Sequence, residues 1–107
     1  MARGERDMWM LVRFDLPVGF KRERRDASRF RAFLKNDGYD MLQFSVYARV
    51  CRGEAGRKKH EERLRRSLPP KGSVRCLTIT DAQYARMAFL VGAKKPQEAA
   101  SAEQMLL

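Results

Sequence analysis

One carboxylate stands out because it follows directly on an apolar run. Residues 9–14 are mostly hydrophobic, Asp15 comes next, and Leu-Pro at 16–17 ends the segment. Such a run predicts a strand that carries Asp15 at its carboxyl end. Because side chains alternate between the two faces of a strand, Arg13 and Asp15 share the less apolar face. Three interpretations stay open for that face: a solvated surface, a dimer seam or a catalytic site.

Other residue types that do chemistry are sparse. Cys51 and Cys76 lie far apart and His60 is the only histidine, so one chain cannot assemble a zinc ligand set. We expect both cysteines to be reduced, small apolar residues. Ser45 has no histidine and acid placed to activate it, which excludes a triad nucleophile. We expect His60 to be a surface residue rather than a general base.

The composition describes one basic domain. The chain has 107 residues, 44% of them hydrophobic, and a formal net charge of +10. That charge favours a polyanionic partner, either nucleic acid or an anionic membrane surface. The apolar runs fall far short of the roughly 20 residues of a membrane span, and residues 1–7 are polar with no signal-peptide pattern after them. We therefore expect a cytoplasmic protein.

The positive charge is spread unevenly along the chain. The net charge is +4 in residues 1–37, +4 in residues 38–70 and +2 in residues 71–107. A solvated helix face is the plainer alternative, but it would not need so one-sided a balance. Phosphate contacts set affinity and register and read no base sequence. The candidate nucleic-acid contacts are Arg13, Lys21, Arg22, Arg25, Arg57, Lys58, Lys59 and Arg66.

Hydrophobic periodicity predicts six elements. They are strands at 8–15, 41–50, 74–80 and 84–91, and helices at 20–36 and 54–68. Residues 41–50 alternate most clearly, with one apolar face and a polar face of Gln43, Ser45, Tyr47 and Arg49. This segment is either bent into two strands or paired directly with the third. Gly38 is placed to end the first helix in the left-handed conformation.

This order predicts an α+β fold, a ferredoxin-like sandwich with both helices on one face of an antiparallel sheet. We expect a single domain over residues 1–92, with a mobile leader at 1–7, and a flexible C-terminal tail at 93–107. The uncovered sheet face predicts a homodimer through stacked sheets. The predicted dimer seam consists of Trp9, Leu11, Gln43, Ser45 and Tyr47.

Four segments in register carry a family resemblance. They are Phe-Asp-Leu-Pro at 14–17, residues 29–39, Gln-Phe-Ser-Val-Tyr at 43–47 and Leu-Thr-Ile-Thr-Asp at 77–81. Over residues 8–92 the chain resembles the CRISPR-associated protein 2 family, in the subtype of type II systems. The resemblance implies a structural dimer for spacer acquisition, in prokaryotic antiviral defence. Such a dimer bridges two dimers of the integrase, CRISPR-associated protein 1, and holds double-stranded DNA on its basic surface.

The resemblance also implies a competing role as a metal-dependent endonuclease on RNA or DNA. Asp15 matches the family's metal ligand, which makes it the candidate catalytic residue and the candidate Mg²⁺ ligand. One carboxylate is a poor Mg²⁺ site, so two copies would have to lie within about 4–8 Å of each other. Otherwise Asp15 caps the turn before Pro17 or pairs with Arg13. A third, weaker interpretation is a toxin-like ribonuclease that shares the fold alone.

One further implication concerns the end of the chain. In the family, the C-terminal segment commonly adds an edge strand to the partner's sheet. The apolar residues 105–107 would begin such a strand. The tail is therefore an expected contributor to the homodimer.

Overall fold

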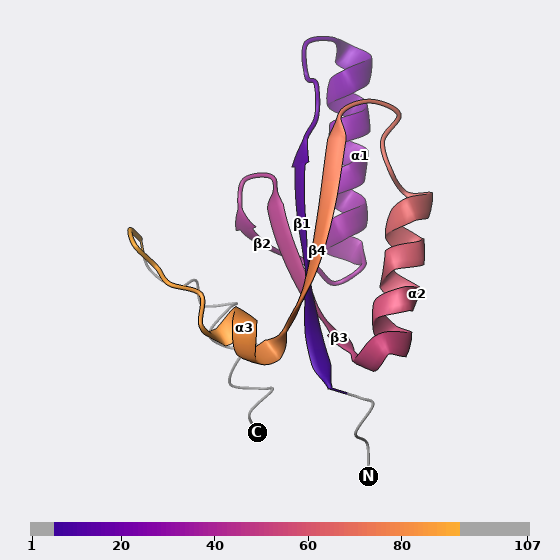
Figure 1. Ribbon diagram of the computed structural model, residues 1–107. Coiled ribbons are helices and arrows are strands. Elements are labelled where there is room, and N and C mark those ends of the chain that lie inside the picture. Colours follow the sequence, from indigo (N-terminus) through magenta and orange to yellow (C-terminus); the bar gives the residue numbers. More distant parts are fainter. Residues whose placement is uncertain (1–5, 93–107) are drawn as a thin grey trace.

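A four-stranded antiparallel sheet forms the frame of the molecule (Figure 1). The computed structural model describes residues 6–92. The elements are β1 (Asp7–Asp15), α1 (Lys21–Asn36), β2 (Asp40–Gln43), β3 (Val46–Arg52), α2 (Gly53–Arg66), β4 (Ser73–Thr80) and α3 (Asp81–Ala85). The βαββαβ order from β1 to β4 confirms the predicted ferredoxin-like α+β fold.

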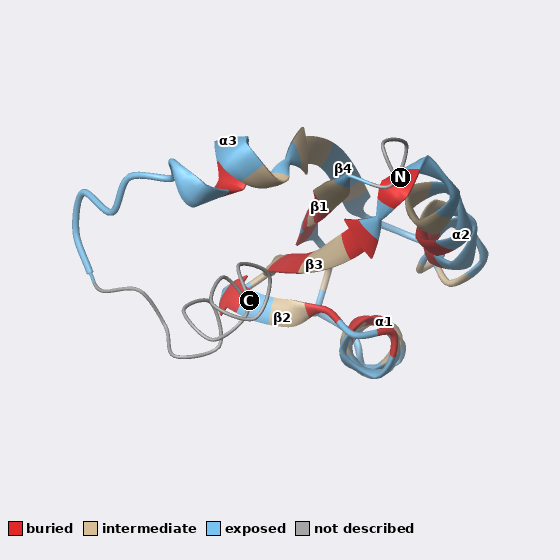
Figure 2. Cartoon of the chain, turned by 90° about the horizontal axis from the view of Figure 1, so that it is seen from below, coloured by how far each residue is buried: buried red, intermediate tan, exposed pale blue. Residues whose placement is uncertain are grey.

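The first strand lies inside the sheet, whose order is β2-β3-β1-β4. β1 pairs antiparallel with β3 and with β4, so both of its edges are satisfied over most of its length. Both long helices cover one face of the sheet, and α3 lies on the opposite side (Figure 2). The face without α1 and α2 is called the open face below.

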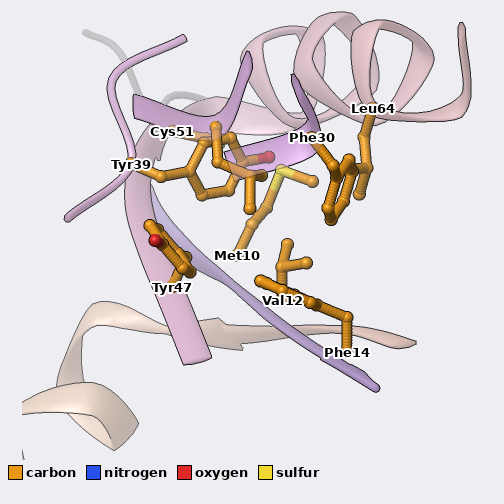
Figure 3. Packing of buried hydrophobic residues seen from close by; sticks show 9 residues of the cluster. Met10, Val12, Phe14, Phe30, Tyr39, Tyr47, Cys51 and Leu64 are labelled. Atoms are coloured by element: carbon orange, nitrogen blue, oxygen red, sulfur yellow. The ribbon is translucent and has the colours of Figure 1, made fainter. Parts of the chain in front are cut away.

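The main core lies between the sheet and the two long helices (Figure 3). Alternate residues of β1 point into it, and Met10 and Val12 are fully buried there. Phe14 meets Phe30 of α1 edge to face, with ring centroids 5.1 Å apart. α2 contributes Leu64 to the same cluster. Burial of such side chains stabilises the fold by about 1.5–3 kcal/mol each, which holds both helices on this face.

The predicted strand at 84–91 is wrong, because α3 and residues without regular structure occupy this segment. Thr80 caps α3: its Oγ1 accepts from the Gln83 backbone at 3.1 Å, and the Gln83 side chain accepts from the Thr80 backbone at 2.9 Å. This reciprocal capping favours a helical turn over an extended chain. As a result Tyr84 stacks on Trp9, with centroids 3.9 Å apart and planes 8° apart.

The alternating segment 41–50 is broken into β2 and β3 by a tight turn. Ser45 in that turn has a φ of +71°, and the β2–β3 register shifts between Met41 and Gln43. The expectation that Tyr47 belongs to a polar face is wrong. Tyr47 is buried in the main core, where its ring lies 5.7 Å from that of Phe14. Leu42 instead lies in the apolar cluster of the open face with Trp9.

The remaining boundaries agree with the sequence prediction to within two residues, and Gly38 takes the expected left-handed conformation with a φ of +91°. β1 begins inside the predicted leader 1–7, and the predicted tail 93–107 lies outside the described residues. Within residues 6–92, none of the helices combines the length and the apolar character that a bilayer crossing requires.

The turn before β4 requires glycine. Gly72 has a φ of +101°, and a Cβ there would lie 2.6 Å from the backbone oxygen of Asp15 and 2.7 Å from Leu16. We expect Gly72→Ala to lower the free energy of unfolding by at least about 1–3 kcal/mol, because backbone strain adds to this clash. Urea unfolding measures the loss. Gly19→Ala is the control, since its Cβ would meet only Glu23 at 3.6 Å and should cost below about 0.5 kcal/mol.

Candidate nucleic-acid interface

Asp15 ends β1 at an exposed corner of the sheet. Its side chain is 75% exposed and lies 3.9 Å from the Arg13 guanidinium. An ion pair this exposed contributes little to stability. The carboxylate is thus accessible and held mainly by the backbone of β1, which pairs Asp15 with Ser73 of β4.

A complete Mg²⁺ site does not form around Asp15 in one chain. Among residues 6–92, no group of three or more His, Cys, Asp or Glu side chains is placed to hold a metal ion. Mg²⁺ prefers near-octahedral oxygen ligation, and Arg13 places positive charge beside the single carboxylate. The donor set of one chain therefore does not fit the ion.

A second arginine flanks this corner on the open face. Arg13 of β1 lies directly opposite Arg75 of β4 in the register. Like charges facing each other across strands are destabilising unless an anion or an acidic partner compensates them. Arg75 was not among the residues predicted from the sequence, because only the β1–β4 register reveals the pair.

The basic residues of α1 form the strongest uncompensated charge. This helix carries seven basic and two acidic residues. Within the described part of the chain, no ion pair engages any of the seven. Six are exposed: Lys21, Arg22, Arg24, Arg25, Arg29 and Lys35. Three of the predicted nucleic-acid contacts therefore lie together on one accessible helix.

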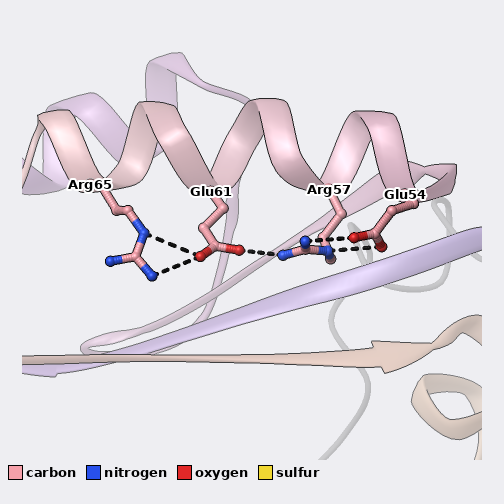
Figure 4. Close-up of polar contacts among 4 residues, drawn as sticks. All are labelled: Glu54, Arg57, Glu61 and Arg65. Carbon is pink, nitrogen blue, oxygen red and sulfur yellow. Dashed lines mark hydrogen bonds and ion pairs between the residues drawn. The ribbon is translucent and has the colours of Figure 1, made fainter.

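α2 differs because its charges neutralise one another (Figure 4). Arg57 binds Glu54 at 2.6 Å and also pairs with Glu61, and Glu61 binds Arg65 at 2.8 Å. The hydrogen bonds from Arg65 and Arg57 lower the pKa of Glu61. Arg57, although predicted to contact phosphate, is thus engaged within its own helix.

The other predicted contacts of α2 keep more of their positive field. Arg66 approaches Glu62 only at 3.7 Å, with both side chains mostly exposed. Lys58 and Lys59 are exposed, and no ion pair joins either to another residue between 6 and 92. The two lysines and Arg66 therefore supply most of the accessible positive charge of α2.

The predicted seam residues do not share one surface. Trp9 and Leu11 lie on the open face, but Trp9 is only 2% exposed under Tyr84, and its indole nitrogen donates to Asp81 at 2.9 Å. Gln43 and Ser45 lie at and beside the β2–β3 turn. Tyr47 is on the helix side and unavailable to a partner sheet. Of these residues, only Leu11 is a half-buried apolar side chain of the open face.

His60 is buried, so the expectation that it lies on the surface is wrong. Its Nδ1 lies 2.9 Å from Asp37 Oδ2, and Arg63 donates to Asp37 Oδ1 at 2.9 Å. The Arg49 guanidinium binds the Asp37 backbone carbonyl. Asp37 thus connects the end of α1 to α2 and to β3. The sequence carries no local signal for this contact, because His60 and Arg63 lie more than 20 positions from Asp37 along the chain.

The electrostatics of this joint favour an ionised Asp37 and a neutral His60. Burial alone would raise the pKa of Asp37, but hydrogen bonds from His60 and Arg63 hold it below the usual range. Burial lowers the pKa of His60, with the neighbouring Arg49 and Lys59 adding to the effect and Asp37 opposing it. A neutral imidazole can donate its Nδ1 proton to the carboxylate.

This joint predicts a loss of stability on acidification. A lowered pKa in the folded state means that the unfolded chain binds the proton more readily, so stability falls as pH drops below the ordinary histidine pKa of about 6.5. Asp37 adds a further loss only below its own ordinary pKa. We expect the Tm of the protein to fall between pH 7.5 and 5.5, measured by calorimetry. His60→Gln should show a smaller fall, and an equal fall in both proteins would contradict the assignment.

The fold and the charge distribution together define a small ferredoxin-like protein with a cationic helix and a basic strand end. The family model described as CRISPR associated protein Cas2 matches residues 8–87. The chain therefore belongs to the Cas2 family of CRISPR-associated proteins.

Three relatives show how extensive the similarity is, and each carries the name CRISPR-associated endoribonuclease Cas2. The protein of Acidovorax ebreus is 55% identical over 91 residues, which cover 85% of this chain and 89% of the relative. That of Flavobacterium psychrophilum is 43% identical, covering 94% and 87%. That of Lacticaseibacillus rhamnosus is 39% identical, covering 94% and 99%.

Proposed function

We propose that this protein is a homodimeric nucleic-acid-binding component of CRISPR adaptation, which holds duplex DNA and bridges dimers of the integrase. The observation that supports it best is α1: six of its seven basic residues are exposed, and none of the seven is paired with a described carboxylate. Long-range attraction to phosphates needs such uncompensated charge. Family membership supports the role in adaptation.

The open face supports the homodimer. Leu77 of β4 is 61% exposed and lies opposite the half-buried Leu11 in the register. Val46, Val50 and Ile79 are half buried on the same face. A second copy of this sheet would remove these side chains from water, which is the usual reason for an apolar face on a small domain. It would also double the cationic surface about a two-fold axis.

The dimer is tested by a charge placed on this face. We expect Leu77→Asp to convert a dimer of about twice 12.4 kDa into a monomer, because a carboxylate cannot be buried unpaired between two sheets. Light scattering after size exclusion measures the mass. Leu68→Asp is the matched control, since Leu68 is 46% exposed and follows α2 on the helix side. A dimeric Leu77→Asp variant, or a monomeric wild type, would contradict this dimer.

Duplex binding should depend strongly on salt. If six or more phosphates are neutralised, the affinity falls by about 10³-fold or more between 50 and 200 mM salt, because condensed counterions are released on binding. We expect Arg22→Gln with Arg25→Gln to weaken binding. The slope of log affinity against log salt should flatten by about 0.9 for each phosphate that the variant no longer neutralises. Fluorescence anisotropy with a labelled duplex measures both effects.

The matched control removes the same charge elsewhere. Arg65 is paired with Glu61, and Arg86 follows α3 at its C-cap. Arg65→Gln with Arg86→Gln should leave the slope close to that of the wild type. Equal losses in the two double variants would show that net charge alone, and not α1, determines binding.

The relatives are named endoribonucleases, which favours RNA cleavage as a second candidate function. The enzyme would be a Mg²⁺-dependent endonuclease that hydrolyses phosphodiester bonds in RNA or DNA. Asp15 is the candidate ligand, and the exposed corner of β1 would admit a nucleic-acid strand. Because one chain lacks a full ligand set among its described residues, this function requires Asp15 of two protomers to share a hydrated ion. The proposed dimer is therefore a condition for it.

Cleavage assays test this candidate directly. Labelled RNA and DNA are incubated with the wild type and with Asp15→Asn, each with Mg²⁺ and with EDTA. The endonuclease predicts cleavage that needs both Mg²⁺ and Asp15, with a loss of at least about 100-fold in the variant. Equal cleavage by the two proteins would identify a contaminant and reject Asp15 as the catalytic residue.

A further inference from the structure

A cavity beside Asp15 combines an aromatic ring with positive charge. It has a volume of about 620 Å³, is open to solvent on one side, and lies between the end of β1, the start of α1 and the β2–β3 turn. Arg13, Asp15, Arg24, Arg31 and Phe44 are among the residues that line it. Three guanidiniums against one carboxylate make the cavity attractive to an anion.

Phe44 is the unusual member of this set. Its side chain is 78% exposed although it is large and apolar, and it lies in the turn between β2 and β3. One face of the ring is covered by the Arg31 guanidinium, whose Cζ lies 3.9 Å from the ring centroid. An isolated exposed phenylalanine would be mobile, whereas this cation–π contact fixes the ring. High exposure together with a covered face leaves the second face accessible.

Arg31 is itself held firmly in place. Its guanidinium also lies 4.9 Å from the centroid of Phe14. It donates to Ser45 Oγ at 3.0 Å and to the Tyr47 hydroxyl at 3.4 Å. The Arg31 guanidinium thus connects the buried Phe14 of β1 to the exposed turn between β2 and β3. The aromatic ring at the tip is oriented before any ligand arrives.

The turn adopts an unfavourable conformation to present this ring. Ser45 has a φ of +71°, which is unfavourable for a residue with a Cβ. Its carbonyl accepts from the Phe14 backbone at 3.1 Å, and its hydroxyl accepts from Arg31. Non-glycine residues in such conformations cluster where function requires a defined geometry. The contacts of Ser45 fix the position of Phe44 relative to Asp15.

We propose that this cavity is a subsite for one unpaired nucleotide, whose base stacks on the free face of Phe44 while its phosphate lies among Arg13, Arg24 and Arg31. Bases stack on aromatic side chains without sequence preference, and arginines hold the adjoining phosphates. A base inside a duplex cannot reach Phe44, so the subsite accepts a single strand or a frayed end. The subsite deepens the proposed function, on which it rests, by naming the part of the nucleic acid that lies next to Asp15.

Fluorescence anisotropy with a 12-nucleotide single strand and a duplex of the same length tests the subsite. Phe44→Ala should lose about 5- to 150-fold in affinity for the single strand, as expected for one stacked base, and less than twofold for the duplex. Phe44→Trp should retain single-strand binding. Phe20→Ala is the matched control, because Phe20 is 71% exposed and lies outside the cavity; it should change neither affinity.

The ligand and the guanidinium supply two further comparisons. A single strand with abasic sites lacks the base that would stack on Phe44. The wild type should bind it more weakly than the intact strand, and Phe44→Ala should bind it with the same affinity as the wild type. Arg31→Lys keeps the charge and removes the planar partner of Phe44, so it should lose single-strand affinity and retain duplex affinity.

Three results would overturn the subsite. The first is that Phe44→Ala binds the single strand with unchanged affinity. The second is that this variant loses affinity equally for duplex and single strand. The third is that it changes its oligomeric state. In the first case, salt-dependent duplex binding would still support the proposed function. A wild type that binds neither nucleic acid would instead reject both.

Discussion

The rest of the structure depends on β1, which is hydrogen-bonded to β3 and β4 at its two edges and buries side chains on both of its faces. Neighbouring residues of this strand are buried on opposite sides: Met10 under the long helices and Trp9 under α3. A shift of one residue would exchange the faces and expose both, so the register is firmly specified. The position of Asp15 and Arg13 at the end of β1 follows from this register and not from their own contacts.

The two long helices share a side of the sheet but differ in how they use charge. α2 joins Glu54, Arg57, Glu61 and Arg65 into a chain of ion pairs on its own surface. Such exposed i,i+3 and i,i+4 pairs contribute little to stability, but they cancel much of the outward field. The cations of α1 have no such partners among the described residues. A polyanion therefore meets its strongest attraction at α1 and at the strand end beside it.

Much of the fold could be predicted from periodicity, and the failures have identifiable physical causes. The alternation of β1 predicts a strand, and the three- and four-residue spacing of Ala27, Phe30 and Leu34 predicts a helix. Both elements formed as expected and pack on one core. Tyr84 was assigned to a strand because its segment is apolar, but the local cap by Thr80 outweighs that tendency. Tyr47 was assigned to the polar face because it alternates with Leu42, Val46, Ala48 and Val50. Those residues do share one face, the open face, but the opposite face with Tyr47 packs under the long helices.

The site was less predictable than the fold because its contacts are distant in sequence. Asp15 and the basic character of α1 could be found from residue types alone. The burial of His60 depends on Asp37, 23 residues away, and the facing arginines Arg13 and Arg75 appear only once the register is known. The stacked pair of Arg31 and Phe44 likewise requires the turn geometry. Pairwise contacts between elements carry no periodic signal that a single sequence could reveal.

The central question is whether this protein positions nucleic acid or cuts it. The most direct test is to reconstitute, with the cognate integrase, the integration of a labelled duplex into a repeat array. Asp15→Asn removes the candidate metal ligand and leaves α1 intact, whereas Arg22→Gln with Arg25→Gln reduces the cationic surface and leaves Asp15 intact. If the protein positions nucleic acid, we expect Asp15→Asn to support normal integration and the double arginine variant to lower the integration yield by at least about tenfold. Loss of integration with Asp15→Asn, together with full integration by the arginine variant, would contradict it.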